Sequence, residues 1–221
     1  TAIIGSTGSG KSTLLHLIPR YFDATEGQIT IDGTNIKDIS LGKLRDMLGF
    51  VPQKGVLFSG TIASNIKFGD ENISDEDMYK AAEIAQALEF IEGKEDKFDS
   101  EISQGGSNVS GGQKQRLSIA RALAKKPKIL LFDDSFSALD YKTDVKLRKT
   151  LREKMQDTTT IIVAQRIATI LNADKIIVMN EGKVVGIGKH QELLKTCPTY
   201  LEIAESQLSE EELAKGGKHN E

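Results

Sequence analysis

An eight-residue segment, GSTGSGKS at residues 5–12, constrains what this chain can fold into more than any other feature. It matches the pattern G-x-x-x-x-G-K-[ST] in full, and its context fits, because the apolar run 1–4 precedes it and apolar residues at helical spacing follow over 14–18. Glycines at these spacings let backbone N–H groups surround phosphate oxygens, and the start of the following helix adds partial positive charge. We expect Lys11 to reach the β- and γ-phosphates of a nucleotide and the Ser12 hydroxyl to ligate Mg²⁺. The predicted nucleotide-binding residues are Gly5, Ser6, Thr7, Gly8, Ser9, Gly10, Lys11, Ser12 and Thr13.

A carboxylate ends the apolar run ILLFD at residues 129–133. A buried strand would deliver Asp133 to its C-terminal edge, beside a phosphate loop, where it can hold Mg²⁺ through water. An aspartate at the end of a strand more commonly caps a turn, and that alternative stays open for Asp133 taken alone. In combination with the phosphate loop, the metal role is favoured.

The rest of the chain alternates apolar runs with segments of helical spacing. Uninterrupted apolar strands alternating with helices predict a parallel sheet covered by helices, and the middle segment 54–116 is predicted to be a mainly helical insertion. We expect strands over 1–4, 48–51, 128–132 and 159–164, helices over 14–19, 74–91, 112–126 and 143–155, and hairpins over 27–36 and around 181–182.

Composition excludes several other classes of protein. Of the 221 residues, 29 are Lys or Arg and 32 are Asp or Glu, so no basic excess attracts nucleic acid or anionic lipid. Apolar residues make up 38% and recur in runs, which excludes disorder, but no run approaches the roughly 20 residues of a membrane-spanning helix. The single cysteine, Cys197, cannot form an internal disulfide, which fits a reducing compartment. The sequence shows no signal segment. Because it starts at Thr1 rather than at a methionine, we expect it to be part of a longer protein.

Further stretches carry a family resemblance. The sequence SGGQ at residues 110–113 matches the signature motif of the ATP-binding cassette (ABC) transporters, although Val109 stands where leucine is usual. With the phosphate loop and Asp133, it makes the chain resemble the nucleotide-binding domain of these transporters over nearly all of its length. Segments 57–66 and 101–106 are similar to the exporter branch of the family.

The resemblance implies an α/β fold: a P-loop NTPase (RecA-like) core with a parallel sheet, an inserted helical subdomain and an antiparallel β portion. It implies a single nucleotide-binding domain over 1–221 that is incomplete at its N-terminus, since the family's adenine-stacking aromatic lies on strands ahead of the phosphate loop. The implied cofactors are ATP and Mg²⁺. The implied parts are a core over 1–53 and 117–195, a helical subdomain with the signature over 54–116, and a C-terminal helix and tail over 196–221.

Residue roles follow by position in the motifs. Gln53 matches the family's Q-loop glutamine, which senses Mg²⁺ and the attacking water and abuts the membrane domain. The implied metal ligands are Ser12, Gln53 and Asp133; the D-loop is Ala138, Leu139 and Asp140; the catalytic positions are Asp134, Gln165 and Gln53.

The signature forms a second anion site. The Ser110 hydroxyl and the backbone N–H groups of Gly111 and Gly112 stand at the start of a predicted helix. One chain does not need two γ-phosphate clamps for one nucleotide, and in the family two domains pair head-to-tail so that each signature closes on the partner's ATP. The implied residues acting on the partner are Ser110, Gly111, Gly112 and Gln113.

Two positions depart from the family pattern. Asp134 stands where the family has the glutamate that polarises the attacking water, and Gln165 stands where it has the switch histidine. Aspartate is one methylene shorter than glutamate, and a misplacement of about 1 Å can cost on the order of 10²-fold in rate. Glutamine can donate a hydrogen bond to phosphate but cannot carry a positive charge. The chain therefore resembles the degenerate-site subunit of a heterodimeric exporter; ordinary hydrolysis with Asp134 and Gln165 is the alternative.

The predicted function is an ATPase domain that dimerises around ATP to power export across a membrane, with slow hydrolysis at its own site. Its implied partners are a transmembrane domain and a second, non-identical nucleotide-binding domain at the cytoplasmic face of a membrane, without nucleic acid. One alternative is a regulatory module that binds ATP without hydrolysing it. A DNA-repair or chromosome-type ATPase is disfavoured by the net charge of −3 and the exporter-like segment 57–66.

Overall fold

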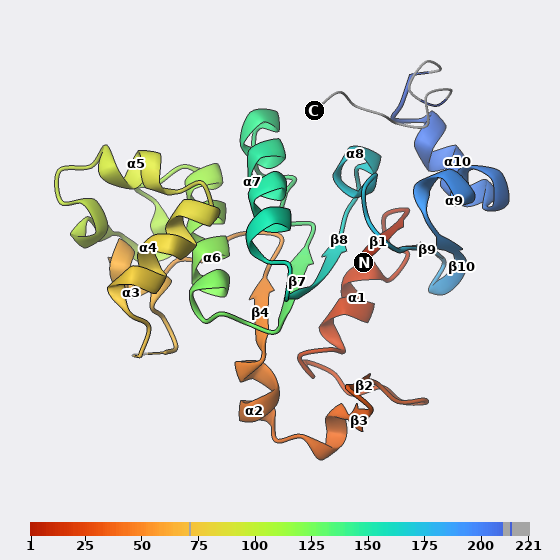
Figure 1. The fold of residues 1–221 in the computed structure, drawn as a ribbon, viewed down its shortest axis with the longest axis horizontal. Coiled ribbons are helices and arrows are strands. Elements are labelled where there is room, and N and C mark those ends of the chain that lie inside the picture. Colours follow the sequence, from red (N-terminus) through yellow and green to blue (C-terminus); the bar gives the residue numbers. More distant parts are fainter. Residues whose placement is uncertain (71, 210–212, 214–221) are drawn as a thin grey trace. The chain divides into compact units, whose positions relative to one another are not determined.

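The computed structural model describes residues 1–70, 72–209 and 213 of the chain (Figure 1). The chain divides into two units. The first unit is formed by Thr1–Ile39 and Thr160–Glu221, and the second by Ser40–Thr159. Within the described residues, no helix combines the length and the apolar character needed to cross a membrane.

In the first unit, β1 (Ala2–Gly5) lies between two parallel neighbours. All four of its residues are buried, as an uninterrupted apolar strand between two neighbours requires. It pairs in parallel with β8 (Thr159–Val163) and with β9 (Ile176–Asn180). The last strand, β10 (Lys183–Gly188), is antiparallel to β9. The predicted parallel sheet with an antiparallel portion is confirmed.

Two tight hairpins of the first unit were predictable from their turn residues. One joins β2 (Thr30–Ile31) to β3 (Thr34–Asn35) through Asp32–Gly33, and the other joins β9 to β10 through Glu181–Gly182. All four turn residues have positive φ, between 47° and 80°. This is the backbone of the two-residue turn whose twist matches that of antiparallel strands.

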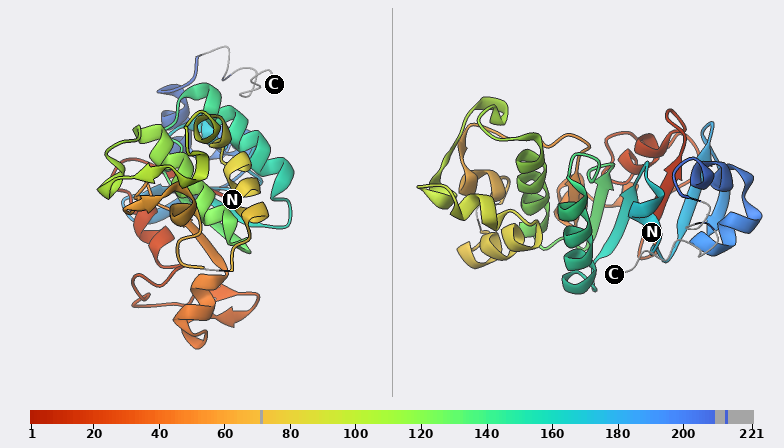
Figure 2. Two further views of the ribbon diagram at one scale, coloured as in Figure 1. Left: turned by 90° about the vertical axis from the view of Figure 1, so that its left-hand side faces the viewer. Right: turned by 90° about the horizontal axis from the view of Figure 1, so that it is seen from above.

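Short helices complete the first unit: α1 (Lys11–His16), the 3₁₀ turn η1 (Ile36–Asp38), α8 (Ile167–Ile170), α9 (His190–Thr196) and α10 (Pro198–Glu205). The last two lie beside β9 and β10 (Figure 2, blue). Tyr200 and Ala204 of α10 are fully buried in the same apolar cluster as Ile167 of α8 and Ile4 of β1. The C-terminal helix is therefore part of the core of this unit.

The second unit contains β4 (Leu48–Val51) and β7 (Ile129–Asp133), which pair in parallel with Val51 opposite Phe132. The long helix α6 (Gly111–Ala124) packs on β4 and on two helices, α3 (Ile62–Ile66) and α4 (Asp75–Ile84). The remaining elements are α2 (Leu41–Asp46), β5 (Gly60–Thr61), α5 (Leu88–Glu92), η2 (Lys97–Asp99), β6 (Glu101–Ile102), η3 (Gln104–Gly106) and α7 (Tyr141–Lys154).

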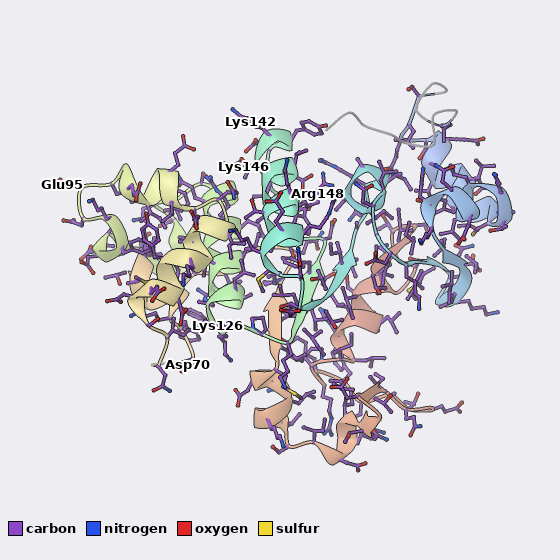
Figure 3. The ribbon with its side chains drawn as sticks, viewed as in Figure 1. Asp70, Glu95, Lys126, Lys142, Lys146 and Arg148 are labelled. Carbon is purple, nitrogen blue, oxygen red and sulfur yellow. The ribbon has the colours of Figure 1, made fainter. Side chains whose placement is uncertain are left out.

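Helix α7 carries several basic side chains, among them Lys142, Lys146 and Arg148 (Figure 3). Arg148 donates two hydrogen bonds to the buried carboxylate of Asp144, at 2.8 and 3.1 Å. Lys142 and Lys146 are exposed. The basic residues of α7 thus divide into a structural ion pair and a solvated face.

Two predicted helices end earlier than expected. The predicted helix over 74–91 is divided, because Gln86 adopts a left-handed φ of 57° after α4. The amide of Ala87 then bonds to the carbonyl of Ala82, which closes α4 before α5 begins. The helix α1 ends at His16 rather than at Pro19, and its last turn tightens through bonds between residues three apart.

Ser74 and Ser110 are the N-caps of α4 and α6, with hydroxyl oxygens accepting the amides of Asp77 and Gln113. Cys197 is buried. Of the predicted C-terminal helix and tail over 196–221, residues 210–212 and 214–221 lie outside the described residues.

Candidate functional site

The phosphate loop connects β1 to α1 in the first unit. Gly8 and Gly10 have φ of 80° and 93°, a backbone region that side chains rarely adopt. The Nζ atom of Lys11 donates to the carbonyl oxygens of Gly5 and Ser6, at 2.9 and 2.7 Å, and lies 3.4 Å from the Ser9 hydroxyl. The lysine side chain is therefore buried, and its ammonium group is bonded to the backbone of the loop.

The start of the loop is packed tightly. A Cβ atom at Gly5 would stand 2.1 Å from the carbonyl oxygen of Met179 on β9, so no side chain fits there. The hairpin turn at Gly182 donates its amide to the carbonyl of Ser9, at 3.1 Å. These contacts hold the loop against the β9–β10 hairpin of the same unit.

The loop fits a phosphate ligand. Ser6, Thr7 and Gly8 are exposed, while Ser9 and Lys11 are buried beneath them. Ser12 follows Lys11 in the first turn of α1 and is half-buried, and Thr13 is exposed. An open glycine-rich backbone above a buried ammonium group is the arrangement that phosphate oxygens require.

The switch position lies at the same sheet edge as the loop. Because β8 runs parallel to β1 with Val163 opposite Ile3, residues that follow the two strands emerge at one edge. Gln165 is exposed there, just before α8. Gln207, which follows α10, accepts the Ile167 amide through Oε1 and donates through Nε2 to the Gln165 carbonyl, both at 2.8 Å.

In the second unit, Gln53 and Asp134 are in contact. Parallel pairing of β4 with β7 brings the ends of both strands to one edge, and Gln53 Nε2 donates to Asp134 Oδ2 at 3.2 Å. Asp133 and Asp134 are both buried. Asp134 has a left-handed φ of 48°, which aspartate tolerates better than most residues.

Two side chains that the sequence did not single out support this edge. The Ser135 hydroxyl, fully buried, donates to the Val51 carbonyl at 2.8 Å. Gln115 of α6, also buried, accepts the Gly55 amide at 2.8 Å and donates to the Pro52 carbonyl at 3.0 Å. The backbone on both sides of Gln53 is thus bonded to α6, the helix that begins at the signature residues.

The predicted metal ligands have the donor chemistry that Mg²⁺ prefers. The predicted ligands offer a hydroxyl from Ser12, a carboxylate from Asp133 and an amide oxygen from Gln53, and all three are hard oxygen donors. Ser12 belongs to the first unit, and the other two belong to the second.

The signature caps α6. Ser110 and Gln113 form a reciprocal capping box, in which Gln113 Oε1 accepts the Ser110 amide at 3.0 Å and the Ser110 hydroxyl accepts the Gln113 amide at 3.2 Å. The hydroxyl hydrogen of Ser110 remains available to a ligand. A Cβ atom at Gly111 would meet open space, whereas one at Gly112 would stand 3.7 Å from the Ala138 carbonyl.

The D-loop residues lie at the start of α7. Ala138 is exposed and Leu139 is buried. Asp140 is the N-cap, and its carboxylate accepts the Thr143 amide at 3.0 Å. This hydrogen bond from the Thr143 backbone lowers the pKa of Asp140. The described structure therefore keeps the signature and the D-loop together in the second unit.

Comparison with known proteins agrees with these motifs. A sequence model of the ABC transporter family matches residues 1–137. An uncharacterized ABC transporter ATP-binding protein of Mycobacterium tuberculosis is 47% identical over 210 residues, which cover 94% of this chain and 36% of that protein. The ATP-dependent lipid A-core flippase of Desulfotalea psychrophila is 46% identical over 194 residues, covering 88% of this chain and 34% of the flippase.

A solved structure has the same fold. It is a bacterial Atm1-family ABC exporter with ATP bound, with a TM-score of 0.90 and 41% identity, and the match covers 95% of this chain and 37% of the exporter chain. The chain spans about a third of the length of the curated relatives it matches. Domains of this family bind ATP with Mg²⁺, which are the cofactors of this chain. The chain belongs to the ABC transporter family, as an ATP-binding domain of the exporter type.

Proposed function

We propose that this chain uses ATP to power export across a membrane, by closing head-to-tail on a second nucleotide-binding domain. The observation that carries the proposal is that one chain has two backbone sites suited to phosphate, the loop at residues 5–12 and the start of α6. The first would hold the chain's own nucleotide, and the second would close on the partner's. Nucleotide held from both sides then stabilises the dimer.

At its own nucleotide, the chain would act through charge and position. Lys11 would exchange its bonds to the Gly5 and Ser6 carbonyls for phosphate oxygens. Ser12 and Asp133 would hold Mg²⁺, with Gln53 beside them; when bound, the ion neutralises charge on the phosphates. Asp134 would polarise the attacking water, and Gln165 would donate a hydrogen bond to the γ-phosphate.

Hydrolysis at this site would be slow. The Asp134 carboxylate is one methylene shorter than glutamate and is already bonded to Gln53 at 3.2 Å. The Gln165 amide cannot carry a charge or a proton. In this proposal the chain forms the degenerate half of a heterodimer, and its signature residues complete the partner's competent site.

The second domain and the membrane domain are the proposed partners, at the cytoplasmic face of a membrane. An exposed aromatic pair supports docking of a membrane domain near the Q-loop: Phe58 and Phe68 stack at 4.2 Å and are 43% and 51% exposed. Arg121 lies over both rings and donates to the carbonyls of Val56 and Asn65. Desolvation lowers the pKa of Arg121 to about 10.

The test compares two single changes in this chain within the full-length, reconstituted transporter. Gly111→Asp places bulk and negative charge where the partner's γ-phosphate would lie, and the open space around Gly111 spares the chain's own packing. We expect it to abolish most ATP turnover. Asp134→Asn, which alters a slow site, should leave most turnover in place.

The opposite result would reverse the assignment. Loss of turnover with Asp134→Asn, together with tolerance of Gly111→Asp, would make this chain's own site the competent one. If neither Gly111→Asp nor Asp134→Asn reduced ATP turnover, the result would favour a regulatory module over an ATPase subunit.

A further inference from the structure

Gln207 is the second residue after α10. It contacts residues 165–167, here called the switch segment, which lie about 40 residues earlier in the chain. Its side-chain amide bonds twice to that segment, accepting the Ile167 amide and donating to the Gln165 carbonyl, each at 2.8 Å. We propose that Gln207 is a positioning residue for Gln165, through which the C-terminal helix sets how well this site distinguishes ATP from ADP. This inference rests on the proposed contact between Gln165 and the γ-phosphate.

The switch segment needs such a support. Helix α8 has only four residues, and its N-cap, Arg166, makes no side-chain capping bond. Gln207 accepts one of the amides that the start of a helix leaves without an internal partner. Gln207 therefore caps the start of α8 from the turn that follows α10.

Gln207 is itself held firmly. Its amide and that of Leu208 both bond to the Ala204 carbonyl, at 3.0 and 2.8 Å, so a hydrogen-bonded turn follows α10 directly. Tyr200, Ala204 and Leu208 are buried in the apolar cluster that also contains Ile167 and Ile170 of α8. A shift of α10 would be transmitted to the switch segment by packing and by two hydrogen bonds.

The effect should appear at the γ-phosphate alone. Gln165 would offer the γ-phosphate one neutral hydrogen bond, whose strength depends steeply on distance and angle. ADP lacks this phosphate, so a displaced Gln165 would weaken ATP binding and leave ADP binding unchanged. A residue that merely stabilises the fold would weaken both.

The test uses the full-length protein with its membrane domain and partner, titrated separately with Mg·ATP and Mg·ADP. Lys11→Ala identifies the binding phase that belongs to this chain's site. Gln207→Met keeps the side-chain length and removes both hydrogen bonds; we expect roughly two- to tenfold weaker ATP binding, with ADP binding unchanged. Glu205→Gln, at the exposed last residue of α10, should change neither.

A double variant separates positioning from general destabilisation. If Gln207 acts through Gln165, Gln165→Ala combined with Gln207→Met should bind ATP no more weakly than Gln165→Ala alone. Additive losses, equal losses for ATP and ADP, or no change with Gln207→Met would overturn the inference. An unchanged ATP-to-ADP ratio in Gln165→Ala would contradict the proposed role of Gln165 itself, a result distinct from a failure confined to Gln207.

Discussion

Two residues determine the chemistry proposed for this chain's own site. Asp134 has a left-handed backbone, and its carboxylate is bonded to Gln53, so its direction is set while its reach is short. Gln165 is exposed, and its backbone is bonded to Gln207. Because hydrogen bonds hold both residues in place, we attribute the proposed slow hydrolysis to the chemistry of their side chains and not to a distorted backbone.

Replacing these two residues by those typical of the family should therefore raise the rate of ATP hydrolysis at this site. We expect Asp134→Glu combined with Gln165→His to raise hydrolysis at this site on the order of tenfold to 10²-fold, because the longer carboxylate recovers about 1 Å and the imidazole can carry charge. The measurement is single-turnover hydrolysis by the full-length protein, with the phosphate-loop lysine of the partner subunit replaced.

Asp134→Gln combined with Gln165→His is the matched control, since it has the same length without a charge. It should show no gain. If the glutamate and histidine pair also shows none, these residues do not limit the rate.

At the scale of elements, α6 ties the signature to the Q-loop. Gln115 is buried and bonds to backbone groups on both sides of Gln53. Gly55 lies so close to this helix that a Cβ atom there would stand 2.7 Å from the Lys114 carbonyl. The Q-loop can therefore move only if these contacts with α6 change.

Gln115→Leu should destabilise the chain. It keeps the volume but leaves the Pro52 carbonyl and the Gly55 amide without partners, which costs roughly 2–4 kcal/mol in the free energy of unfolding. Urea unfolding of the purified chain measures this loss. Gln104→Leu, the same change at an exposed position, should cost less than about 0.5 kcal/mol. Equal effects of the two changes would argue against the two bonds of Gln115.

The contact between α9 and α10 should make stability depend on pH. His190 Nδ1 lies 2.7 Å from the Tyr200 hydroxyl, and within the described residues its Nε2 is buried without a hydrogen-bond partner. Burial lowers the pKa of His190 below its usual 6.5, so the unfolded chain binds the proton more readily. This contribution to the free energy of unfolding should be fully present above pH 6.5, the usual pKa of histidine, and should be lost as the pH falls below it.

His190→Gln should reduce this loss between pH 7.5 and pH 5.5, measured by urea unfolding at both values. Tyr200→Phe keeps the buried imidazole and should retain the pH dependence. A loss of stability on acidification that is as large in His190→Gln as in the wild type would assign it to other groups.

At the scale of the whole molecule, the proposed nucleotide ligands come from both units. The phosphate loop and Gln165 belong to the first, and Gln53, Asp133, Asp134 and the signature belong to the second. The signature has no proposed role toward the chain's own nucleotide. We therefore expect the isolated chain to bind Mg·ATP and to hydrolyse it very slowly.

Lys11→Ala should weaken that binding by roughly tenfold or more, because a charge-assisted contact to phosphate contributes about 1.5–3 kcal/mol. Nucleotide titration of the isolated chain measures the change. Lys142→Ala, which removes an exposed lysine from α7 (Figure 3), should bind like the wild type. Superimposable titrations of wild type and Lys11→Ala would contradict the position assigned to Lys11.

Features that depend on neighbouring residues could be predicted from the amino-acid sequence. The phosphate loop needs glycines at fixed spacing, the hairpin turns need residues that accept positive φ, and the caps at Ser74 and Ser110 bond three residues ahead. Uninterrupted apolar runs likewise indicated the parallel strands. Each of these is decided within a few residues, so its pattern is visible before folding.

Contacts between distant segments could be found only in the folded chain. Gln115 and Gln207 each bond to backbone 40 or more residues away, and in the sequence nothing distinguishes them from other polar residues. Gln86 ends α4 early, and its carbonyl accepts a hydrogen bond from Arg116 of α6. Such bonds depend on which helices pack together, because a side-chain amide finds its backbone partners only after hydrophobic packing has brought the segments into reach.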